Sequence, residues 1–234
     1  MNPTRIDLLG EHYFLFSHTD AKEESCFSSV PNGAAVSLTP SLTADFCVKP
    51  CAKNAKQRTN DPVGAVCAAA HLSLVRGLPL DEFEFETPDG ILKIFRTGDG
   101  FFALTIPKCK VLFTETAEML GCEVRYTDVF MLDGVYRVVQ SENASASHPS
   151  ALTPLLSVGR YLPDAVLFSS VTEGELYILP YTDFNPSPPS SLLLFSSAAY
   201  AYGGRFGELS ARSGSLFLRA SHSTVSVKIK CEIK

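Results

Sequence analysis

Turn residues divide this chain into short apolar segments with the spacing of β-strands. Three such segments, 83–87, 91–96 and 101–106, are rich in aromatic and aliphatic residues and are separated by the turn sequences PDG and TGDG. Short apolar runs joined by glycine turns are typical of a β-meander. Alternating apolar positions over 215–220 and 224–233 predict a second meander at the end of the sequence.

Two segments interrupt the strand pattern with the composition of buried helices. The first, 64–75, is rich in alanine, has almost no charge and is followed by Gly77 and Pro79, which are helix-ending residues. A helix that lacks a charged face is expected to be buried all round. The second segment, 196–202, has the same character, and we expect it to end at the glycine pair 203–204.

The helical segments belong to a repeated pattern. GAVCAAAH at 64–71 matches SSAAYAYG at 196–203, and TPDGILKI at 87–94 matches ARSGSLFL at 211–218. Each half of the chain therefore consists of strands, a buried helix and a hairpin. This pattern predicts an α+β fold of two similar lobes, each wrapping its strands around one central helix.

The lobe boundary is expected between about 121 and 133, so that residues 1–125 form the N-terminal lobe and residues 126–234 the C-terminal lobe. The segment 141–154, SENASASHPSALTP, is polar and without periodicity. It is typical of a connection on the surface, as a plain loop or as a lid.

Composition excludes several classes of function. Lysine and arginine together number 20 against 25 acidic residues, and no basic run is interleaved with aromatic residues, so we expect no nucleic-acid partner. Asp7, Glu11 and His12 interrupt the apolar residues near the N-terminus, which is unlike a signal peptide. No segment approaches the roughly 18 apolar residues that span a bilayer. We expect a cytoplasmic protein, a monomer or a homodimer, without a membrane partner.

The seven cysteines are scattered along the sequence, and their number is odd. This usage is typical of reduced thiols in a cytoplasm. The closest pair, Cys47 and Cys51, has no nearby cysteine or histidine pair to complete a zinc site, so no metal is expected. His71, in the first helical segment, is expected to be a hydrogen-bonded helix residue and not a metal ligand.

A ligand is expected at the starts of the two helices. Free backbone amides and the positive end of the helix dipole lie there, and two helix starts that face each other across a lobe interface would converge on one carboxylate. The loops to search are TNDPV at 59–63 and PSPPSSLLLF at 186–195. The three leucines at 192–194 would instead fill such a cleft with apolar side chains.

Over most of its length the chain resembles the diaminopimelate epimerase superfamily, which also includes proline racemase-like and phenazine-biosynthesis isomerase-like proteins. The segments that carry the resemblance are RIDLLGEHYFLF at 5–16, NDPVGAVCAAAHL at 60–72, GLPLDEFEFETPDGILKIFRTGDGFFALTIPK at 77–108 and DGVYRVVQ at 133–140. The resemblance implies that each lobe is a strand-rich half-barrel around its helix. It also implies chemistry without a cofactor, on a small amino or carboxylic acid.

Members of that superfamily invert an α-carbon with two opposed bases, commonly cysteine thiolates, one ahead of each helix. The matching positions here are Asp61 and Ser191, and Cys67 lies inside the first helical segment. A serine hydroxyl has too high a pKa to act as an unassisted base, so two-thiol racemisation is expected to be lost. The resemblance implies Asp61 and Ser191 as the catalytic positions. The ligand-binding positions that it implies are Glu11, Asn60, Gly64, Ala65, Ser196 and Ser197.

Several of these residues have a second interpretation. Asp61 followed by Pro62 is typical of a helix cap, but a raised pKa would make Asp61 a base for one-base isomerisation. Ser196 and Ser197 also fit caps at a helix start. Glu11 and His12, as neighbours on a strand, are expected to point to opposite faces and not to form an acid/base pair.

Three classes of function remain open at this point. The chain is a cofactor-independent isomerase of a small acid, a non-catalytic binding relative or pseudoenzyme, or a structural or partner-binding protein. Epimerase activity on diaminopimelate is not expected.

Overall fold

The computed structural model describes most of the chain, and within it two compact units. The described residues are 4–17, 34–50, 62–87, 90–119, 122–132, 134–140, 149–186, 188–206 and 209–234. One unit contains residues 1–104 and 228–234, and the other contains residues 105–227. The lobe boundary near 121–133 stays a prediction from the sequence.

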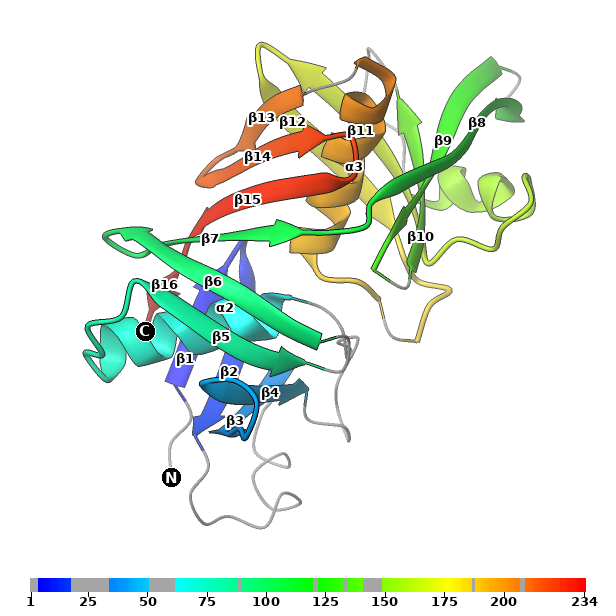
Figure 1. Ribbon diagram of the computed structural model, residues 1–234. Helices are drawn as coiled ribbons and strands as arrows, with labels where there is room; N and C mark the ends of the chain where they lie inside the picture. The colour runs from blue at the N-terminus through cyan, green and yellow to red at the C-terminus, as the bar shows by residue number, and fades with distance from the viewer. Residues whose placement is uncertain are drawn as a thin grey trace. The chain divides into compact units, whose positions relative to one another are not determined.

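The first unit is built from strands that surround one helix (Figure 1). In hydrogen-bonded order its strands are β16 (Glu232–Ile233), β1 (Thr4–Leu8), β2 (Glu11–Ser17), β3 (Ala34–Pro40), β4 (Phe46–Pro50), β5 (Glu82–Thr87), β6 (Gly90–Gly98) and the first part of β7 (Phe101–Ile106), which crosses the unit boundary after Leu104. Helix α2 (Val63–Ala70) connects β4 to β5, which are parallel. The meander over 82–106 that the sequence predicts is therefore confirmed.

Helix α2 is the core of the first unit. All its residues are buried, and it packs on β2, β3, β4 and β6. Alanine, glycine and valine let these strands approach the helix backbone closely, while aromatic side chains such as Phe83 and Phe85 fill the remaining space. The helix continues as a π-helical turn over His71–Val75, so the helical segment predicted at 64–75 is confirmed.

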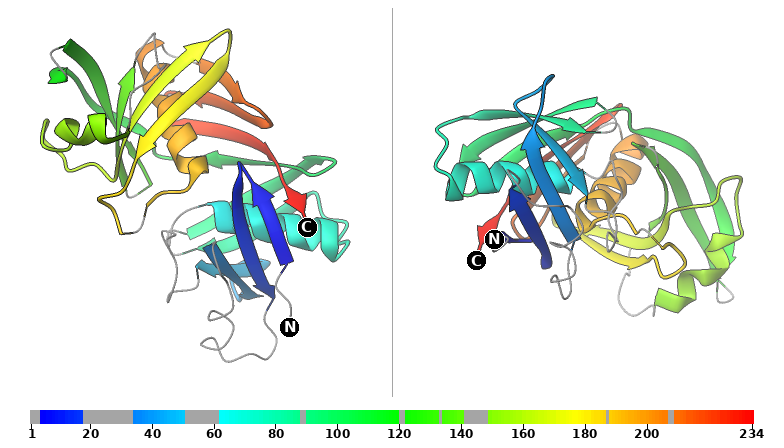
Figure 2. Two further views of the ribbon diagram at one scale, coloured as in Figure 1. Left: turned by 180° about the vertical axis from the view of Figure 1, so that it is seen from behind. Right: turned by 90° about the horizontal axis from the view of Figure 1, so that it is seen from below.

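The second unit has the same plan around α3 (Ser191–Phe206). In hydrogen-bonded order its strands are β8 (Lys110–Met119), β9 (Cys122–Met131), β10 (Gly134–Gln140), β11 (Ala165–Thr172), β12 (Glu175–Tyr181), β13 (Leu209–Ser213), β14 (Leu216–Ser221) and the first part of β15 (Thr224–Lys230), which crosses the unit boundary after Val227. A 3-10 helix, Pro149–Leu156, lies between β10 and β11 in the chain. The views from behind and from below in Figure 2 show each helix among the strands of its own unit.

The two units repeat one order of strand pairings. From β1 to β6 the pairings are antiparallel, parallel, antiparallel, parallel and antiparallel, and the helix follows the fourth strand. From β9 to β14 the pairings and the place of the helix are the same. This is the arrangement that an internal repeat produces. Each unit is thus a strand-rich half-barrel around one helix, as the sequence predicts.

The bounds of α3 differ from the prediction at both ends. The helix begins at Ser191, because Leu192, Leu193 and Leu194 form its buried first turn. It also continues through the glycine pair at 203–204 to Phe206. A Cβ on Gly203 would lie only 2.6 Å from the Cβ of Ala220 in β14. This glycine is therefore a site of close packing and does not end the helix.

Replacing Gly203 by alanine should lower the free energy of unfolding by about 1–3 kcal/mol, since the added methyl group overpacks the contact between α3 and β14. Helix propensity alone would favour alanine by about 1 kcal/mol, so the sign of the change tests the contact. Chemical denaturation provides the measurement. The second-site change Ala220→Gly should recover part of the loss. If Gly203→Ala is as stable as the parent, the close approach is contradicted.

Candidate functional site at the helix starts

The first turn of α2 contains backbone amides that have no partner within the helix. Pro62 occupies the cap position with φ −67°, and its carbonyl accepts a hydrogen bond from the Val66 amide at 3.2 Å. Gly64 and Ala65 lie in the first turn, where amides have no partner within the helix. Among the described residues no side chain caps this turn, and the turn contains no acidic residue. The amides of Gly64 and Ala65 are therefore suited to a carboxylate.

Asp61 and Asn60 lie outside the described residues. The roles predicted for them, in catalysis and ligand binding, stay predictions. In the sequence they directly precede Pro62, the cap residue of α2.

The start of α3 has a side-chain cap and a buried first turn. The Ser190 hydroxyl accepts a hydrogen bond from the Leu193 amide at 3.4 Å, and the Ser190 carbonyl accepts one from the Leu194 amide at 3.0 Å. Ser190 thus caps the helix. Ser191, the predicted catalytic position, is the first helical residue and is half-buried. The side chains of the next three residues are buried leucines, which offer no polar group to a ligand.

Ser196 and Ser197 are not at a helix start, so their interpretation as caps is wrong. Both lie inside α3 and are fully buried. The Ser196 hydroxyl donates to the Leu192 carbonyl at 2.7 Å, and the Ser197 hydroxyl donates to the Leu194 carbonyl at 2.9 Å. Both hydroxyls therefore satisfy backbone carbonyls of the helix's own first turn. Their predicted role in ligand binding stays a prediction.

No cysteine of the described residues lies at either helix start. Cys67 is fully buried in the middle of α2, and Cys47 is half-buried on β4. Burial raises the pKa of Cys109 and of Cys231 to about 12, so both remain thiols near neutral pH. None of these four groups is placed to act as a thiolate base in the first turn of α2 or α3.

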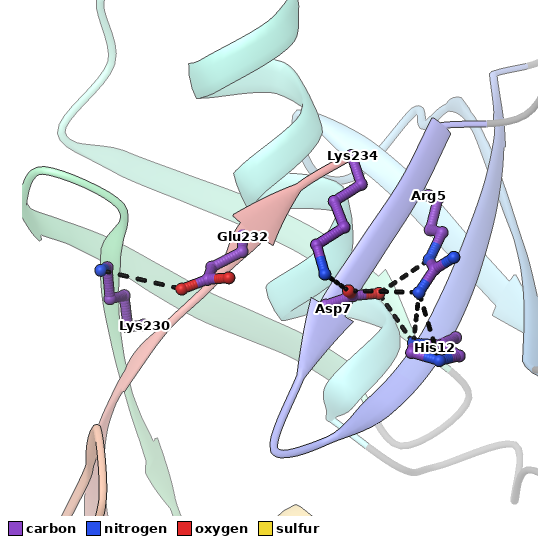
Figure 3. Close-up of polar contacts among 6 residues, drawn as sticks. All are labelled: Arg5, Asp7, His12, Lys230, Glu232 and Lys234. Carbon is purple, nitrogen blue, oxygen red and sulfur yellow. Dashed lines mark hydrogen bonds and ion pairs between the residues drawn. The ribbon is translucent and has the colours of Figure 1, made fainter.

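Glu11 and His12 lie at the start of β2 and contact different groups. The Tyr13 hydroxyl donates to Glu11, while His12 Nδ1 lies 2.8 Å from Asp7 Oδ1 (Figure 3). Asp7 also accepts from Arg5 Nε at 2.9 Å, and Lys234 Nζ lies 2.8 Å from its other oxygen. The hydrogen bond from Arg5 is the main reason that the pKa of Asp7 is well below its usual range. His12 is therefore part of a charged cluster, and it forms no acid/base pair with Glu11.

Comparison with known proteins identifies the fold. No family model matches the sequence, and no curated protein matches it. Among solved structures, a phenazine-biosynthesis PhzC/PhzF protein from Clostridium difficile superposes with a TM-score of 0.68 at 10% identity, covering 99% of this chain and 96% of that one. A PhzF-family protein from Enterococcus faecalis gives 0.66 at 11% identity, covering 98% and 95%. A hydroxyproline epimerase from Agrobacterium vitis gives 0.59 at 14% identity, covering 99% and 90%.

This chain has the diaminopimelate epimerase-like fold. The structural match extends over both units, which confirms the fold that the sequence resemblance implies. At such low identity the likeness establishes the fold alone.

In the second unit of this fold, sequence reasoning missed a fully buried ion pair. The guanidinium of Arg137 on β10 donates to both carboxylate oxygens of Asp128 on β9, each at 2.7 Å, and neither side chain is exposed. The remaining donors of Arg137 bind the carbonyls of Leu155, Val158 and Tyr161. A signal was present for Arg137, the only charge in the otherwise apolar β10, and the two residues are direct partners in the β9–β10 register. The arrangement holds the loop after the 3-10 helix.

His71 is less well satisfied than the sequence suggested. Its Nε2 accepts from Arg76 Nε at 3.4 Å, but its buried Nδ1 has no partner within the described residues. Burial, aided by the charge of Arg76, lowers the pKa of His71, so the ring is neutral near pH 7. No group of three or more metal-ligating side chains occurs in the described part of the chain, and no helix there is long and apolar enough to span a membrane.

Proposed function

We propose that this protein is a divergent relative of the isomerases that share its fold, that it binds a small amino or carboxylic acid, and that it has lost two-thiol racemisation. The observation that carries the proposal is the contrast between the two helix starts. Within the described residues no side chain caps the amides of Gly64 and Ala65 at the α2 start, while the α3 start has Ser190, Ser191 and buried leucines.

The ligand class follows from the chemistry of the α2 start and is supported by the comparisons. Backbone amides at a helix N-terminus bind oxyanions without a charged side chain. The hydroxyproline epimerase from Agrobacterium vitis contains bound trans-4-hydroxy-L-proline, and a proline racemase from Agrobacterium radiobacter contains bound carbonate. Both ligands have a carboxylate-type group of the kind that such amides hold.

A second candidate is a structural or partner-binding role. The buried leucines at 192–194 and the cap of Ser190 leave the α3 start without an open donor pair comparable to that of α2. A small acid that is contacted by the start of α2 alone would be bound weakly or not at all. A cytoplasmic location and a monomeric or homodimeric state stay predictions.

Titration of the ¹⁵N-labelled protein with L-proline, trans-4-hydroxy-L-proline and diaminopimelate tests the proposal. A bound carboxylate should shift the amide resonances of Gly64 and Ala65, because these N–H groups become its hydrogen-bond donors. L-Prolinamide, which has the same ring but no carboxylate, should shift them far less. If no small acid moves these two amides at millimolar concentration, ligand binding is excluded and the structural role is favoured.

A further inference from the structure

The second unit contains a pocket that is separate from the helix starts. Its volume is about 520 Å³. Small-molecule sites typically have volumes of roughly 300–1,000 Å³. The residues that line it are Lys108, Cys109, Lys110, Val111, Tyr200, Gly203, His222 and Ser223. Tyr200 and Gly203 belong to the later turns of α3, so this pocket is distinct from the α3 start at Ser191.

Hydrogen bonds hold the walls of the pocket in place. The Tyr200 hydroxyl lies 2.8 Å from the Cys109 carbonyl and 2.5 Å from the His222 carbonyl, so one buried proton is shared between two backbone segments. The Cys109 amide donates to the Ser223 carbonyl at 2.8 Å. These contacts fix the loop before β8 and the turn between β14 and β15 to α3. The pocket is therefore preformed, which lowers the entropic cost of binding.

The rim of the pocket is cationic. Lys108 and Lys110 are exposed, and neither has an ion-pair partner among the described residues. Other lysines of this acidic chain, such as Lys93, are paired with carboxylates. Lys108 also has a φ of 59°, a left-handed conformation that disfavours a side chain. Two cations without a carboxylate partner in the described part of the chain thus lie on either side of Cys109, one of them with a left-handed backbone.

The floor of the pocket is apolar and unreactive. Cys109, Tyr200 and Gly203 are buried, and Val111 is half-buried. The thiol of Cys109 is protonated, since burial raises its pKa to about 12. The Tyr200 hydroxyl is engaged with two carbonyls. The lining also contains the exposed residues His222 and Ser223, so polar groups lie beside the two lysines and the apolar surface is confined to the buried residues.

We propose that this pocket binds a small molecule that has an oxyanion group, a carboxylate or a phosphate, attached to an apolar ring or chain. Lys108 and Lys110 pair with the oxyanion at the rim, and the apolar part lies on the floor beside Val111. The site is independent of the amides at the α2 start.

Binding of phenyl phosphate, benzoate and benzyl alcohol to the full chain, measured by calorimetry at low salt, tests this proposal. Both anions should bind more tightly than the neutral alcohol, and the tighter of the two identifies phosphate or carboxylate as the preferred group. The variant Lys108→Asn with Lys110→Gln should weaken anion binding about tenfold, because two charge contacts are lost. Asparagine is chosen at 108 because it tolerates the left-handed backbone.

The control variant Lys49→Gln removes an exposed lysine of the first unit and should leave the affinity unchanged. In ¹⁵N spectra, the amides of Lys110 and His222 should shift, while those of Gly64 and Ala65 report the other site. The proposal is overturned if neither anion binds, if the alcohol binds equally well, or if the double variant binds as tightly as the parent. Shifts at Gly64 and Ala65 alone would overturn it while supporting the proposed function.

Discussion

Replacing Arg137 by methionine is expected to lower the free energy of unfolding by about 3–5 kcal/mol, the largest stability effect that this structure predicts. The substitution keeps most of the side-chain volume but leaves the Asp128 carboxylate buried without its counter-ion. It also removes the donors that satisfy the carbonyls of Leu155, Val158 and Tyr161. Each buried polar group that loses its partner adds to the cost.

The loop around Arg137 is shaped by this side chain. A Cβ on Gly159 would lie 2.7 Å from Arg137 Nη2, and Gly159 has a φ of +79°. The ring of Tyr126 lies on the guanidinium, 4.9 Å from its central carbon. The guanidinium of Arg137 therefore contacts the loop at Gly159, the ring of Tyr126 and the carboxylate of Asp128. Its loss should affect the whole region from β9 to the 3-10 helix.

The destabilisation should depend on pH. Burial raises the pKa of Asp128, and Arg137 opposes that rise, so the pKa should rise further in Arg137→Met. When the pKa of a carboxyl group is higher in the folded than in the unfolded state, the free energy of unfolding decreases as the pH rises from the unfolded-state pKa to the folded-state pKa. The difference between Arg137→Met and the parent should thus be smallest at acid pH, where Asp128 is protonated, and largest near neutrality.

Two further variants separate a buried-charge effect from lost packing. In Arg137→Met with Asp128→Leu, both charges are absent, and the stability should be higher than in Arg137→Met alone. Arg212→Met breaks the ion pair with Glu175, in which Arg212 is largely exposed, and should cost less than about 1 kcal/mol. Urea denaturation at several pH values measures all three. Equal losses for Arg137→Met and Arg212→Met would contradict the assignment of a buried pair.

The fold could be predicted from the sequence where the information is local. The period of apolar residues in 83–106 and the alanine-rich run after Pro62 specify strands and a buried helix without reference to the rest of the chain. The matching segments in the second half then indicate two similar half-barrels.

The sequence-based predictions were wrong or incomplete where a residue's role depends on tertiary packing. The glycine pair at 203–204 has the sequence of a helix end, yet Gly203 is present because β14 approaches α3 closely. The string PSPPSS has the composition of a loop, and only the hydrogen bond from Leu193 shows that Ser190 is a cap. Arg137 is a charged residue in an apolar strand, but the sequence does not show that it pairs with Asp128. That ion pair depends on the β9–β10 register.

The largest functional effect we expect is the absence of proton exchange at the α-carbon of a candidate substrate. One positioned acid or base contributes roughly 10²–10⁴ to a rate, so a site that lacks both thiols should be slower by about 10⁴ or more than a two-base enzyme. Incubation of proline and diaminopimelate with the purified protein in D₂O, followed by NMR of the α-position, measures this. A hydroxyproline epimerase of the same fold, incubated with trans-4-hydroxy-L-proline under the same conditions, serves as the positive control.

Deuterium at the α-carbon would contradict the loss of catalysis and would direct attention to Asp61. The roles of Asp61 as cap and as base have opposite signatures. As a cap, Asp61 should tolerate replacement by asparagine, while Asp61→Ala should cost roughly 1 kcal/mol of stability, because alanine cannot accept a hydrogen bond from a first-turn amide. If Asp61 is a base, Asp61→Asn should lose proton exchange although its fold remains intact, since an amide cannot take the proton.

Thermal melts of both variants, run beside the exchange assay and the Gly64 and Ala65 titration, separate these outcomes. We expect Asp61→Asn to retain both its stability and its ligand affinity, which would exclude a role of Asp61 as a base; loss of exchange in a stable Asp61→Asn protein would instead establish one-base catalysis.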